Sequence, residues 1–493
     1  MRILTAVTEA PPLRSGVAEV ASQLRDRLPQ LGHTVDLYTV GDAGRVQFGE
    51  VRLTGAVRQW RGLRRRLADY ELLHLHGPAP TFSEVVLAIW RSLPRAARPA
   101  LVYTHHCPID LGRARPLCAV YNGAHRSLIR GADHVVVSTE SYRAIMSRGG
   151  VAPISVIPFG GAALAAPEPR DRAERFTVAF VGQLRPYKGV HVLLEAANLL
   201  PDVVFEIAGA GPSERGLRAQ AHRLRLRNVR WMGAVSNHER EAMLRRAHVI
   251  ALPSTTRAEA FGIVLVEGMR LGAVPVASSL PGVSDVVGDR GLLCRPRDPL
   301  SLVQAICYLR DDPRTWSGLS ERAQQGAAAF TWHESAFAYN RVYHDALLGR
   351  QLSRGARPDR LLDQVRQGML ADRASVLIPD RGGRHLRLAL SVGAELPPAA
   401  RGSRVVSRGG WAGRTLADGR PAIVSGPASP HPDGEPIHSG MCVPVALGEG
   451  PPVGVMTFSR LRRRRSFDQQ ELAWASNEGR RLAVTLAASV AGP

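Results

Sequence analysis

Over roughly the first 335 residues, short apolar runs alternate with longer amphipathic stretches, and this alternation constrains the fold more than any other feature. Between the first two runs, Val17, Val20, Leu24 and Leu28 recur at helical spacing. A strand, a helix and a second strand in succession form the unit from which parallel sheets are built. The expected strands of this first part are Arg2–Val7, Thr34–Val40, Leu72–His76, Leu101–Thr104, His134–Val137 and Ile154–Ile157.

The alternation is interrupted once. Residues Gly160–Arg175 are rich in alanine, proline and charge, a composition typical of a linker. The pattern then restarts, so we expect two tandem Rossmann-like, doubly wound α/β domains, residues 1–165 and 170–335, with a cleft between them. The second domain is expected to have strands Thr177–Val181, Val203–Ala208, Val229–Trp231, Val249–Leu252, Val274–Ala277 and Leu292–Cys294, and helices Val190–Leu200, Glu239–Ala247, Gly262–Leu271 and Leu300–Leu309.

After about residue 350 the pattern changes to strands without intervening helices. Helices near Leu361–Leu370 and Gln470–Ala488 flank them. This order predicts an α+β domain with an antiparallel sheet over residues 355–493, joined to the preceding domain by residues 336–354. Its expected strands are Arg373–Ile378, His385–Ser391, Pro421–Val424, Met441–Val445 and Val453–Phe458.

Composition narrows the class of protein. A chain of 493 residues suits about three domains of ordinary size. The apolar run at the N-terminus breaks at Thr8-Glu9, which indicates a first strand rather than a signal peptide, and no stretch approaches the ~20 apolar residues of a membrane-spanning helix. The cysteines are odd in number and form no Cys-x-x-Cys pair, so neither a zinc knuckle nor a disulfide framework is expected and a reducing cytoplasm fits best. They are Cys107, Cys118, Cys294, Cys307 and Cys442.

The net charge of +21 comes from arginine, which accounts for 63 of the 64 basic residues. Local clusters lie at Arg64–Arg66, Arg223–Arg230 and Arg462–Arg465. None of them alternates with aromatic residues as in single-strand binders, so nucleic acid is disfavoured as a partner. An anionic membrane or an anionic substrate is favoured over nucleic acid, although a solvated basic surface is the preferred explanation of any single cluster.

Lys188 is the only lysine in the chain. It follows an expected strand and precedes Gly189 and an expected helix, where backbone N–H groups and a partial positive charge attract anions. A lysine ammonium is a compact point charge that the planar arginine fork does not replace against phosphate oxygens. We therefore favour a functional role over a lysine that survives by chance on a surface turn. A second glycine-containing junction of this kind precedes the first helix at Ser15-Gly16.

Two carboxylates follow the strand Val249–Leu252. Glu259 precedes the next helix, and Glu267 lies in its second turn. Together with free N–H groups near Phe261, they would accept sugar hydroxyls and hold an anion between them. The alternative is that Glu259 only complements the helix dipole and that Glu267 faces solvent.

These residues belong to a wider set that resembles glycosyltransferase family 4, retaining enzymes of the GT-B fold. The resemblance covers about residues 1–345. Phe330-Thr331-Trp332 to Leu347 resembles the helix that crosses back from the second domain to the first. The matching motifs are Val181-Gly182 to Lys188-Gly189, Ile207-Ala208-Gly209-Ala210-Gly211-Pro212, Val249 to Ser254, Glu259 to Glu267, Gly272-Ala273-Val274-Pro275-Val276-Ala277 and Pro281-Gly282.

The resemblance implies how the donor would be held. Gly16 would offer its amide to the donor phosphate, and Lys188 would neutralise the diphosphate. Glu259, with the amides of Phe261 and Gly262, would hold the transferred sugar. Glu267 would take the ribose hydroxyls.

The resemblance extends to further positions, and for the two histidines among them the alternative is an ordinary strand-end residue. Ala234-Val235 would sit beside the base, and His106 in Thr104-His105-His106 would reach the donor sugar. His76 matches a second histidine at a strand end, but it is equally well explained as an ordinary strand residue. Two departures from the family pattern stand out. Gln183 replaces a second diphosphate cation that Arg185 or Arg257 would have to supply, and Ser15-Gly16 replaces a Gly-Gly pair.

A mechanism follows from these implications. The chain contains no Asp-x-Asp, so we expect no metal and no other cofactor, with Lys188 and two helix N-termini stabilising the leaving diphosphate. No enzymic nucleophile is evident. We therefore expect retention through same-face attack by the acceptor, with the leaving phosphate taking the proton, in a site completed by domain closure.

Residues from about 355 to 490 resemble a GAF domain, a small-molecule-binding sensor fold. The match rests on Ala374-Ser375-Val376-Leu377-Ile378-Pro379-Asp380, Gly410-Trp411-Ala412-Gly413-Arg414, Met441-Cys442-Val443-Pro444-Val445 and Gly454-Val455-Met456-Thr457-Phe458. Cys442 is expected to be a buried strand residue. The hypothesis is that this domain, with or without a small-molecule ligand, regulates the transferase or mediates homodimerisation.

The sequence thus predicts a retaining, metal-independent hexosyltransferase that uses a nucleotide diphosphate sugar. The sequence does not distinguish a glycan, a lipid and a small molecule as the acceptor. We expect a cytoplasmic protein, with peripheral association at the inner face of the membrane as an alternative. One rival interpretation is a weak or inactive transferase that acts as a ligand-gated scaffold, which the Gln183 departure supports. A GT-B epimerase or phosphorylase is another, which the motif set disfavours.

Overall fold

The computed structural model describes residues 1–10, 15–39, 45–48, 51–54, 60–110, 115–151, 153–161, 172–353, 357–380, 385–394, 404–407, 410–425, 437–446, 452–461 and 465–490. They form two compact units, Met1–Tyr339 and Asn340–Pro493. The expected end of the second strand at Val40, most of the Gly160–Arg175 linker and part of the Arg462–Arg465 cluster lie outside the described residues. No helix within these ranges is both long enough and apolar enough to cross a bilayer.

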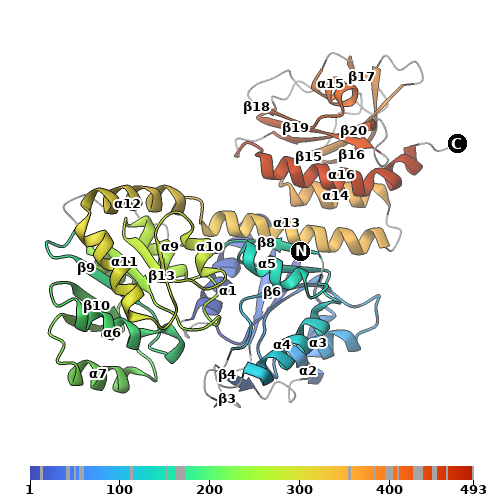
Figure 1. The fold of residues 1–493 in the computed structure, drawn as a ribbon. Helices are drawn as coiled ribbons and strands as arrows, with labels where there is room; N and C mark the ends of the chain where they lie inside the picture. The colour runs from blue at the N-terminus through green and yellow to red at the C-terminus, as the bar shows by residue number, and fades with distance from the viewer. Residues whose placement is uncertain are drawn as a thin grey trace. The chain divides into compact units, whose positions relative to one another are not determined.

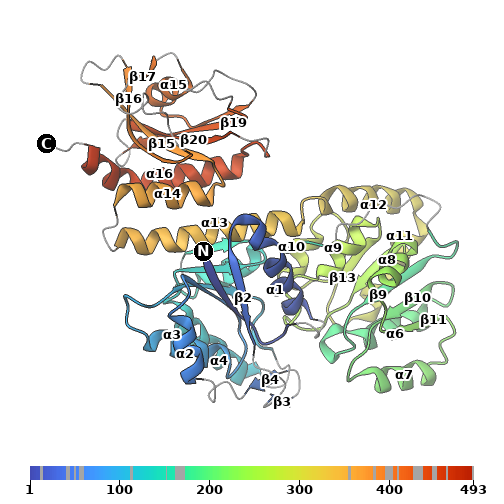
Figure 2. The ribbon, with the colours of Figure 1, turned by 180° about the vertical axis from the view of Figure 1, so that it is seen from behind.

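The first unit begins with a sheet of six parallel strands in the order β2-β1-β5-β6-β7-β8 (Figure 1). Every residue of β5 and β6 is buried, as expected for central strands that helices cover on both faces. The strand order reverses direction between β1 and β5, and Figure 2 shows β2 in front, beside α1. The strands are β1 (Arg2–Ala6), β2 (Thr34–Tyr38), β5 (Leu72–Gly77), β6 (Ala100–His105), β7 (His134–Val137) and β8 (Ile154–Val156).

Helices connect these strands as the apolar spacing predicts. Val20, Ala21 and Leu24 of α1 are buried, and Ser15 caps the helix by accepting a hydrogen bond from the backbone N–H of Ala18 at 3.1 Å. A separate antiparallel pair, β3 (Arg45–Phe48) and β4 (Val51–Thr54), was not predicted. The helices are α1 (Gly16–Arg27), α2 (Trp60–Leu67), α3 (Ser83–Ser92), α4 (Arg115–Ile129) and α5 (Glu140–Ser147), with a short 3₁₀ turn, η1 (Leu28–Leu31).

The second sheet repeats the design, with six parallel strands in the order β11-β10-β9-β12-β13-β14. The strand order reverses between β9 and β12, and ligands of such sheets bind at the carboxyl ends of the strands beside this point. Its strands are β9 (Thr177–Val181), β10 (Val204–Ala208), β11 (Val229–Gly233), β12 (Val249–Leu252), β13 (Val274–Ser278) and β14 (Leu292–Cys294), and its helices are α6 (Val190–Leu199), α7 (Glu214–Arg223), α8 (Asn237–Arg246), α9 (Ile263–Arg270), α10 (Val283–Val287), α11 (Pro299–Asp311) and α12 (Pro313–Ala327).

After β8, the end of the first domain contacts the segment that joins α12 to α13. The backbone N–H of Gly161 donates to the carbonyl of Phe330 at 3.0 Å. A Cβ on Gly160 would lie 2.1 Å from the backbone nitrogen of Trp332, so only glycine permits this approach. The hydroxyl of Ser335 also donates to the carbonyl of Pro158 at 2.7 Å. These contacts hold the start of helix α13 (Trp332–Ser353) against the first domain.

The second unit contains an antiparallel sheet in the order β17-β16-β15-β20-β19-β18. Alternate side chains point to opposite faces, as the period of a strand requires. Val376, Val443 and Met456 pack in one core, whereas Leu377 and Val455 pack in another. The strands are β15 (Arg373–Pro379), β16 (His385–Gly393), β17 (Arg404–Ser407), β18 (Ala422–Ser425), β19 (Ser439–Ala446) and β20 (Pro452–Arg460).

Helices cover both faces of this sheet (Figures 1 and 2). Helices α14 (Pro358–Gly368) and α16 (Gln469–Val490) lie side by side on the first face. Helix α15 (Trp411–Asp418) lies on the other. The expectation of strands without intervening helices was therefore wrong, because α15 lies between β17 and β18. Its eight residues give too short a periodic pattern to separate from the turns around them.

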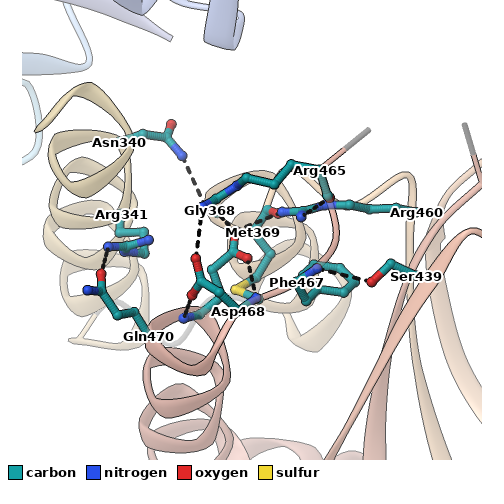
Figure 3. A network of polar contacts seen from close by, with 11 residues as sticks. Asn340, Arg341, Gly368, Met369, Ser439, Arg460, Arg465, Phe467, Asp468 and Gln470 are labelled. Atoms are coloured by element: carbon teal, nitrogen blue, oxygen red, sulfur yellow. Dashed lines mark hydrogen bonds and ion pairs between the residues drawn. The ribbon is translucent and has the colours of Figure 1, made fainter. Parts of the chain in front are cut away.

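Within the second unit, the later part of α13 is tied to α14 and α16 (Figure 3). The side-chain amide of Asn340 donates to the carbonyl of Gly368 at 3.0 Å, and Arg341 donates to Gln470 at 3.2 Å. Nearby, Arg460 forms an ion pair with Glu471 at 2.8 Å, and both side chains are almost fully buried. Polar contacts thus accompany the apolar core in holding the three helices together.

Candidate active site

Lys188 lies in a tight turn after β9, in a short 3₁₀ helix, η5 (Pro186–Lys188). Gly189 follows with φ +72°, and a Cβ there would lie 1.8 Å from the carbonyl oxygen of Pro253. Only glycine allows the turn to approach the loop after β12 this closely. The backbone N–H of Thr255 donates to the carbonyl of Tyr187 at 2.7 Å and joins the two loops.

This approach brings Lys188 to Glu259. Lys188 Nζ lies 2.5 Å from Glu259 Oε2, and the two side chains are 15% and 10% exposed. The hydroxyl of Ser254 donates to the same carboxylate oxygen at 3.2 Å. Burial would lower the pKa of Lys188, but the adjacent Glu259 carboxylate outweighs it and holds this pKa above the ordinary value. Lys188 therefore stays charged although it is nearly buried.

The loop that carries Glu259 also presents backbone donors. Gly262 has φ +78° and precedes the first residue of α9, Ile263. The N–H groups of Phe261 and Gly262 make no hydrogen bond to other described residues. Such groups at a helix N-terminus are suited to an anion or a polar oxygen.

Glu267 is buried, so the alternative interpretation, in which Glu267 faces solvent, was wrong. It is 7% exposed and forms an ion pair with Arg240 at 3.3 Å. Arg240 is placed by α8, which begins with a capping box in which Ser236 and Glu239 each bond the other's backbone N–H. Burial raises the pKa of Glu267, Arg240 opposes the shift, and Glu19 of α1 adds to it. The first and second domains thus come close together at this carboxylate.

The first domain contributes buried imidazoles. Nδ1 of His76, at the end of β5, lies 2.9 Å from Nε2 of His106, which follows β6. Burial, with a smaller effect from neighbouring imidazoles, holds the pKa of both histidines well below the ordinary value, so both rings are neutral. The ring of Phe159 lies 5.7 Å from that of His106 and 5.2 Å from that of Phe261, which links the two domains.

Three protein-family models match this chain. The model of glycosyl transferases group 1 matches residues 166–329, the model of glycosyltransferase family 4 matches residues 14–160, and the GAF domain model matches residues 359–487. The D-rhamnosyltransferase WbpZ of Pseudomonas aeruginosa is 30% identical over 54% of this chain and 71% of its own length. Glycogen synthase of Mycobacterium tuberculosis is 32% identical over 60% of this chain and 72% of its own length.

The chain is a family 4 glycosyltransferase with a C-terminal GAF domain.

Solved structures agree on the fold of this glycosyltransferase. Sucrose-phosphate synthase of Thermosynechococcus elongatus superposes with a TM-score of 0.58 at 20% identity, over 72% of this chain and all of the other. Anabaena HepE in complex with UDP and glucose superposes with a TM-score of 0.56 at 21% identity, over 69% and 99%. The fold is therefore GT-B, with two Rossmann-like domains, and the transferase uses nucleotide-sugar donors.

The other predicted donor residues lie on separate elements of the two Rossmann-like domains. Gly16 begins α1, and a Cβ there would meet open space. Arg185 donates to the side chain of Gln183 at 2.7 Å, so the residue that departs from the family pattern is bonded to one of its expected replacements. Arg257 is exposed, and its carbonyl accepts from Tyr142 at 3.2 Å. Ala234 and Val235 follow β11.

Sequence reasoning missed four residues at this candidate site: Ser254, Arg240, Phe159 and Cys107. Burial raises the pKa of the Cys107 thiol to about 12, and the carboxylates of Glu259 and Glu9 add to this shift. Cys107 thus lies near the Lys188–Glu259 pair from the side of the first domain. Its place directly after His106 was the signal that could have identified it, whereas nothing in the sequence relates Arg240 to Glu267.

Proposed function

We propose that this glycosyltransferase transfers a hexosyl group from a nucleoside diphosphate sugar with retention of anomeric configuration and without a bound metal. The observation that carries the proposal is the buried ion pair between Lys188 and Glu259. Glu259 lies on the same loop as Phe261 and Gly262, whose N–H groups bond no other residue that the structure describes. A fixed cation, a carboxylate and two amides suit a sugar attached to a diphosphate.

The chemistry that these residues support is a substitution at the anomeric carbon. The bond from that carbon to the diphosphate oxygen breaks, and negative charge collects on the departing diphosphate. Lys188 is held in place by Glu259 before the donor arrives, so it stabilises this charge without reorganising, an effect worth about 3 kcal/mol for one such donor. The acceptor hydroxyl forms the new bond on the same face, and its proton goes to the leaving phosphate oxygen.

The names of relatives guide the choice of substrates. Matches include an O-antigen chain mannosyltransferase of Escherichia coli and a phosphatidyl-myo-inositol mannosyltransferase of Mycolicibacterium smegmatis. We infer a hexose or deoxyhexose donor and a glycan or lipid acceptor for this chain.

A donor screen tests the proposal. UDP-, GDP- and ADP-sugars are compared for thermal stabilisation of the full chain and for slow hydrolysis, because a ligand of the native state raises stability by mass action. One donor class is expected to stabilise and to be hydrolysed, with turnover unchanged by EDTA and with retained configuration in the transfer product by NMR. Stabilisation without turnover would instead support the scaffold interpretation, and inversion would refute the mechanism.

We further propose that the GAF domain regulates transfer through α13. This helix carries Tyr339, whose hydroxyl lies 3.0 Å from the Thr104 hydroxyl in the first unit. The next residue, Asn340, is fully buried and bonds Gly368 of α14 in the second unit. A change in the packing of α14 would therefore act on the same helical turn that contacts β6.

The test compares two adjacent substitutions in the full chain. Asn340→Ala removes the buried bond, and Arg341→Ala removes an exposed one as a matched control. Turnover is expected to change in Asn340→Ala and to stay within about twofold of wild type in Arg341→Ala. Equal turnover in all three proteins would refute coupling through this turn.

A further inference from the structure

Two neighbouring strands bring histidines together at the carboxyl end of the first sheet. In the pairing of β5 with β6, His76 lies opposite Thr104 and Gly77 lies opposite His105. The backbone N–H of His106 then donates to the carbonyl of Gly77 at 2.8 Å, which continues the pairing by one residue. The rings of His76 and His106 stack with centroids 5.2 Å apart and planes inclined by 22°.

The contact between these rings is a hydrogen bond between two nitrogens. With 2.9 Å between His76 Nδ1 and His106 Nε2, one nitrogen must carry the proton and the other must accept it. Both rings are buried, with 1% and 8% exposure, and neutral. Each therefore carries a single N–H, and only two arrangements of the protons are possible.

The second ring nitrogen of His76, Nε2, distinguishes the two arrangements. His76 Nε2 is buried and has no hydrogen-bond partner among the described residues. If His106 donated, the single N–H of His76 would be placed on Nε2 and left buried without an acceptor. If His76 donates from Nδ1, only a lone pair is left unmatched there. An orphaned buried N–H is the rarer and costlier defect, so His76 is the donor.

The same assignment determines the other ring. Because Nε2 of His106 accepts, the proton of this neutral imidazole must be on Nδ1. No hydrogen bond joins His106 Nδ1 to any other described residue. His106 also lies beside Phe159, which contacts the Phe261 loop. Among the described residues, His106 is therefore left with one unmatched donor, on a ring that Phe159 connects to the loop of the proposed sugar-binding amides.

We propose that His76 is a positioning residue that holds His106 in its Nδ1–H tautomer, so that His106 donates a hydrogen bond to a hydroxyl oxygen of the donor sugar. In this arrangement His106 does not act as a base, which leaves the acceptor proton to the departing phosphate. The inference rests on the proposed function for the identity of the oxygen, but the tautomer itself does not depend on activity.

His74 and Thr104 support the His76 ring. The His74 ring lies 4.2 Å from the His76 ring, and His74 Nε2 lies 2.7 Å from the Thr104 hydroxyl. That hydroxyl also contacts Tyr339 of α13 at 3.0 Å. Burial, with a smaller effect from His106, lowers the pKa of His74 to about 3, so this layer is neutral as well. The His76 ring is thus fixed in orientation between two neutral imidazoles, His74 and His106.

The experiment compares two replacements of His76. Asn can donate from Nδ2, which takes the place of Nδ1–H, whereas Leu cannot donate. We expect His76→Leu to lower kcat/KM by about tenfold or more and His76→Asn to stay within about threefold of wild type. His134→Leu is the matched control, because His134 is a buried histidine that bonds Ser155 at 2.9 Å and stands at the start of β7 rather than at the carboxyl end of the sheet.

Two further readouts separate positioning from folding. In a His106→Ala background the effect of His76→Leu should vanish, because the two residues act as one unit. Nitrogen NMR of histidine-labelled wild type should find His106 protonated on Nδ1. Protonation on Nε2, or equal losses in the Leu and Asn variants, would overturn the proposal. If the wild type does not hydrolyse any donor, the proposed function is refuted instead. The NMR experiment would then still decide the tautomer of His106.

Discussion

The two Rossmann-like domains have the same architecture but opposite electrostatics at their strand ends. In the first domain, His76 and His106 are buried with no carboxylate of the described ranges bonded to them, and burial makes them neutral. In the second, Lys188 is nearly as buried but touches Glu259, and it keeps its charge. Burial alone therefore does not determine charge. The nearest partner decides whether a buried group ionises.

Under the proposed function, this difference would give the two domains separate tasks. Fixed charges suit the diphosphate, whose charge grows as the glycosidic bond breaks. Neutral imidazoles suit directional hydrogen bonds to sugar hydroxyls, which carry no charge. The contrast leads to four tests, ordered by the size of the expected effect.

Removing the buried cation should have the largest effect. Lys188→Ala is expected to lower transfer by about 10²-fold or more, because the leaving group loses its fixed positive charge. It also leaves Glu259 uncompensated, at a cost of about 2 kcal/mol in folding free energy. Initial rates and thermal unfolding measure the two effects.

A double variant separates them. Lys188→Ala combined with Glu259→Gln removes both charges, so it should regain most of the lost stability without regaining activity. Near-normal turnover in either purified protein would contradict the role of Lys188.

The carboxylate of the same pair should matter for the sugar more than for the diphosphate. Glu259→Gln is expected to lower kcat/KM by about tenfold and to weaken thermal stabilisation by the nucleotide sugar. Stabilisation by the nucleoside diphosphate alone should change little. Equal weakening with both ligands would show that Glu259 acts only through Lys188.

Glu267 should have a smaller effect, confined to binding. If it takes the ribose hydroxyls, Glu267→Gln removes an interaction that the ground state and the transition state share. KM for the donor should rise about fivefold while kcat stays near wild type. Arg240→Gln is the companion variant, because Arg240 contacts Glu267 at 3.3 Å. A fall in kcat with unchanged KM would argue against the ribose assignment.

Glu478 of the C-terminal unit is a buried carboxylate that shares its cation, Arg481, with a second carboxylate, Asp345. Burial raises its pKa to about 7, Arg481 opposes the shift, and Asp345, which also contacts Arg481, adds to it. The folded state then binds a proton more tightly than the unfolded state, whose pKa is the ordinary 4.5. Stability should therefore be greater at pH 6 than at pH 8, by about 1 kcal/mol.

Thermal unfolding of wild type and Glu478→Gln at both pH values isolates this contribution. The variant should lose that part of the pH dependence, since glutamine does not titrate. Identical pH dependence in the two proteins would show that Arg481 compensates Glu478 fully.

Much of the fold followed from periodicity along the chain. The expected strands His134–Val137, Thr177–Val181, Val249–Leu252 and Leu292–Cys294 match β7, β9, β12 and β14 to the residue. Three of these strands, β7, β9 and β12, are almost entirely buried, so their apolar runs are nearly continuous, whereas the edge strand β14 exposes Leu293. Helix α15, with eight residues, and the β3–β4 pair, with four residues in each strand, were missed because such short elements carry little apolar pattern.

The sequence by itself determined the two tandem parallel domains, the antiparallel C-terminal domain, and the residue types that gather at strand ends, with Lys188 as the only lysine. It did not determine which of these residues meet. Lys188 and Glu259 are 71 residues apart, and they touch because β9 and β12 are neighbours in the sheet and Gly189 admits the Pro253 carbonyl. His76 and His106 meet because β5 pairs with β6. Spacing along a strand selects the face of a side chain, but strand order, which only the packing of the whole sheet decides, selects its partner.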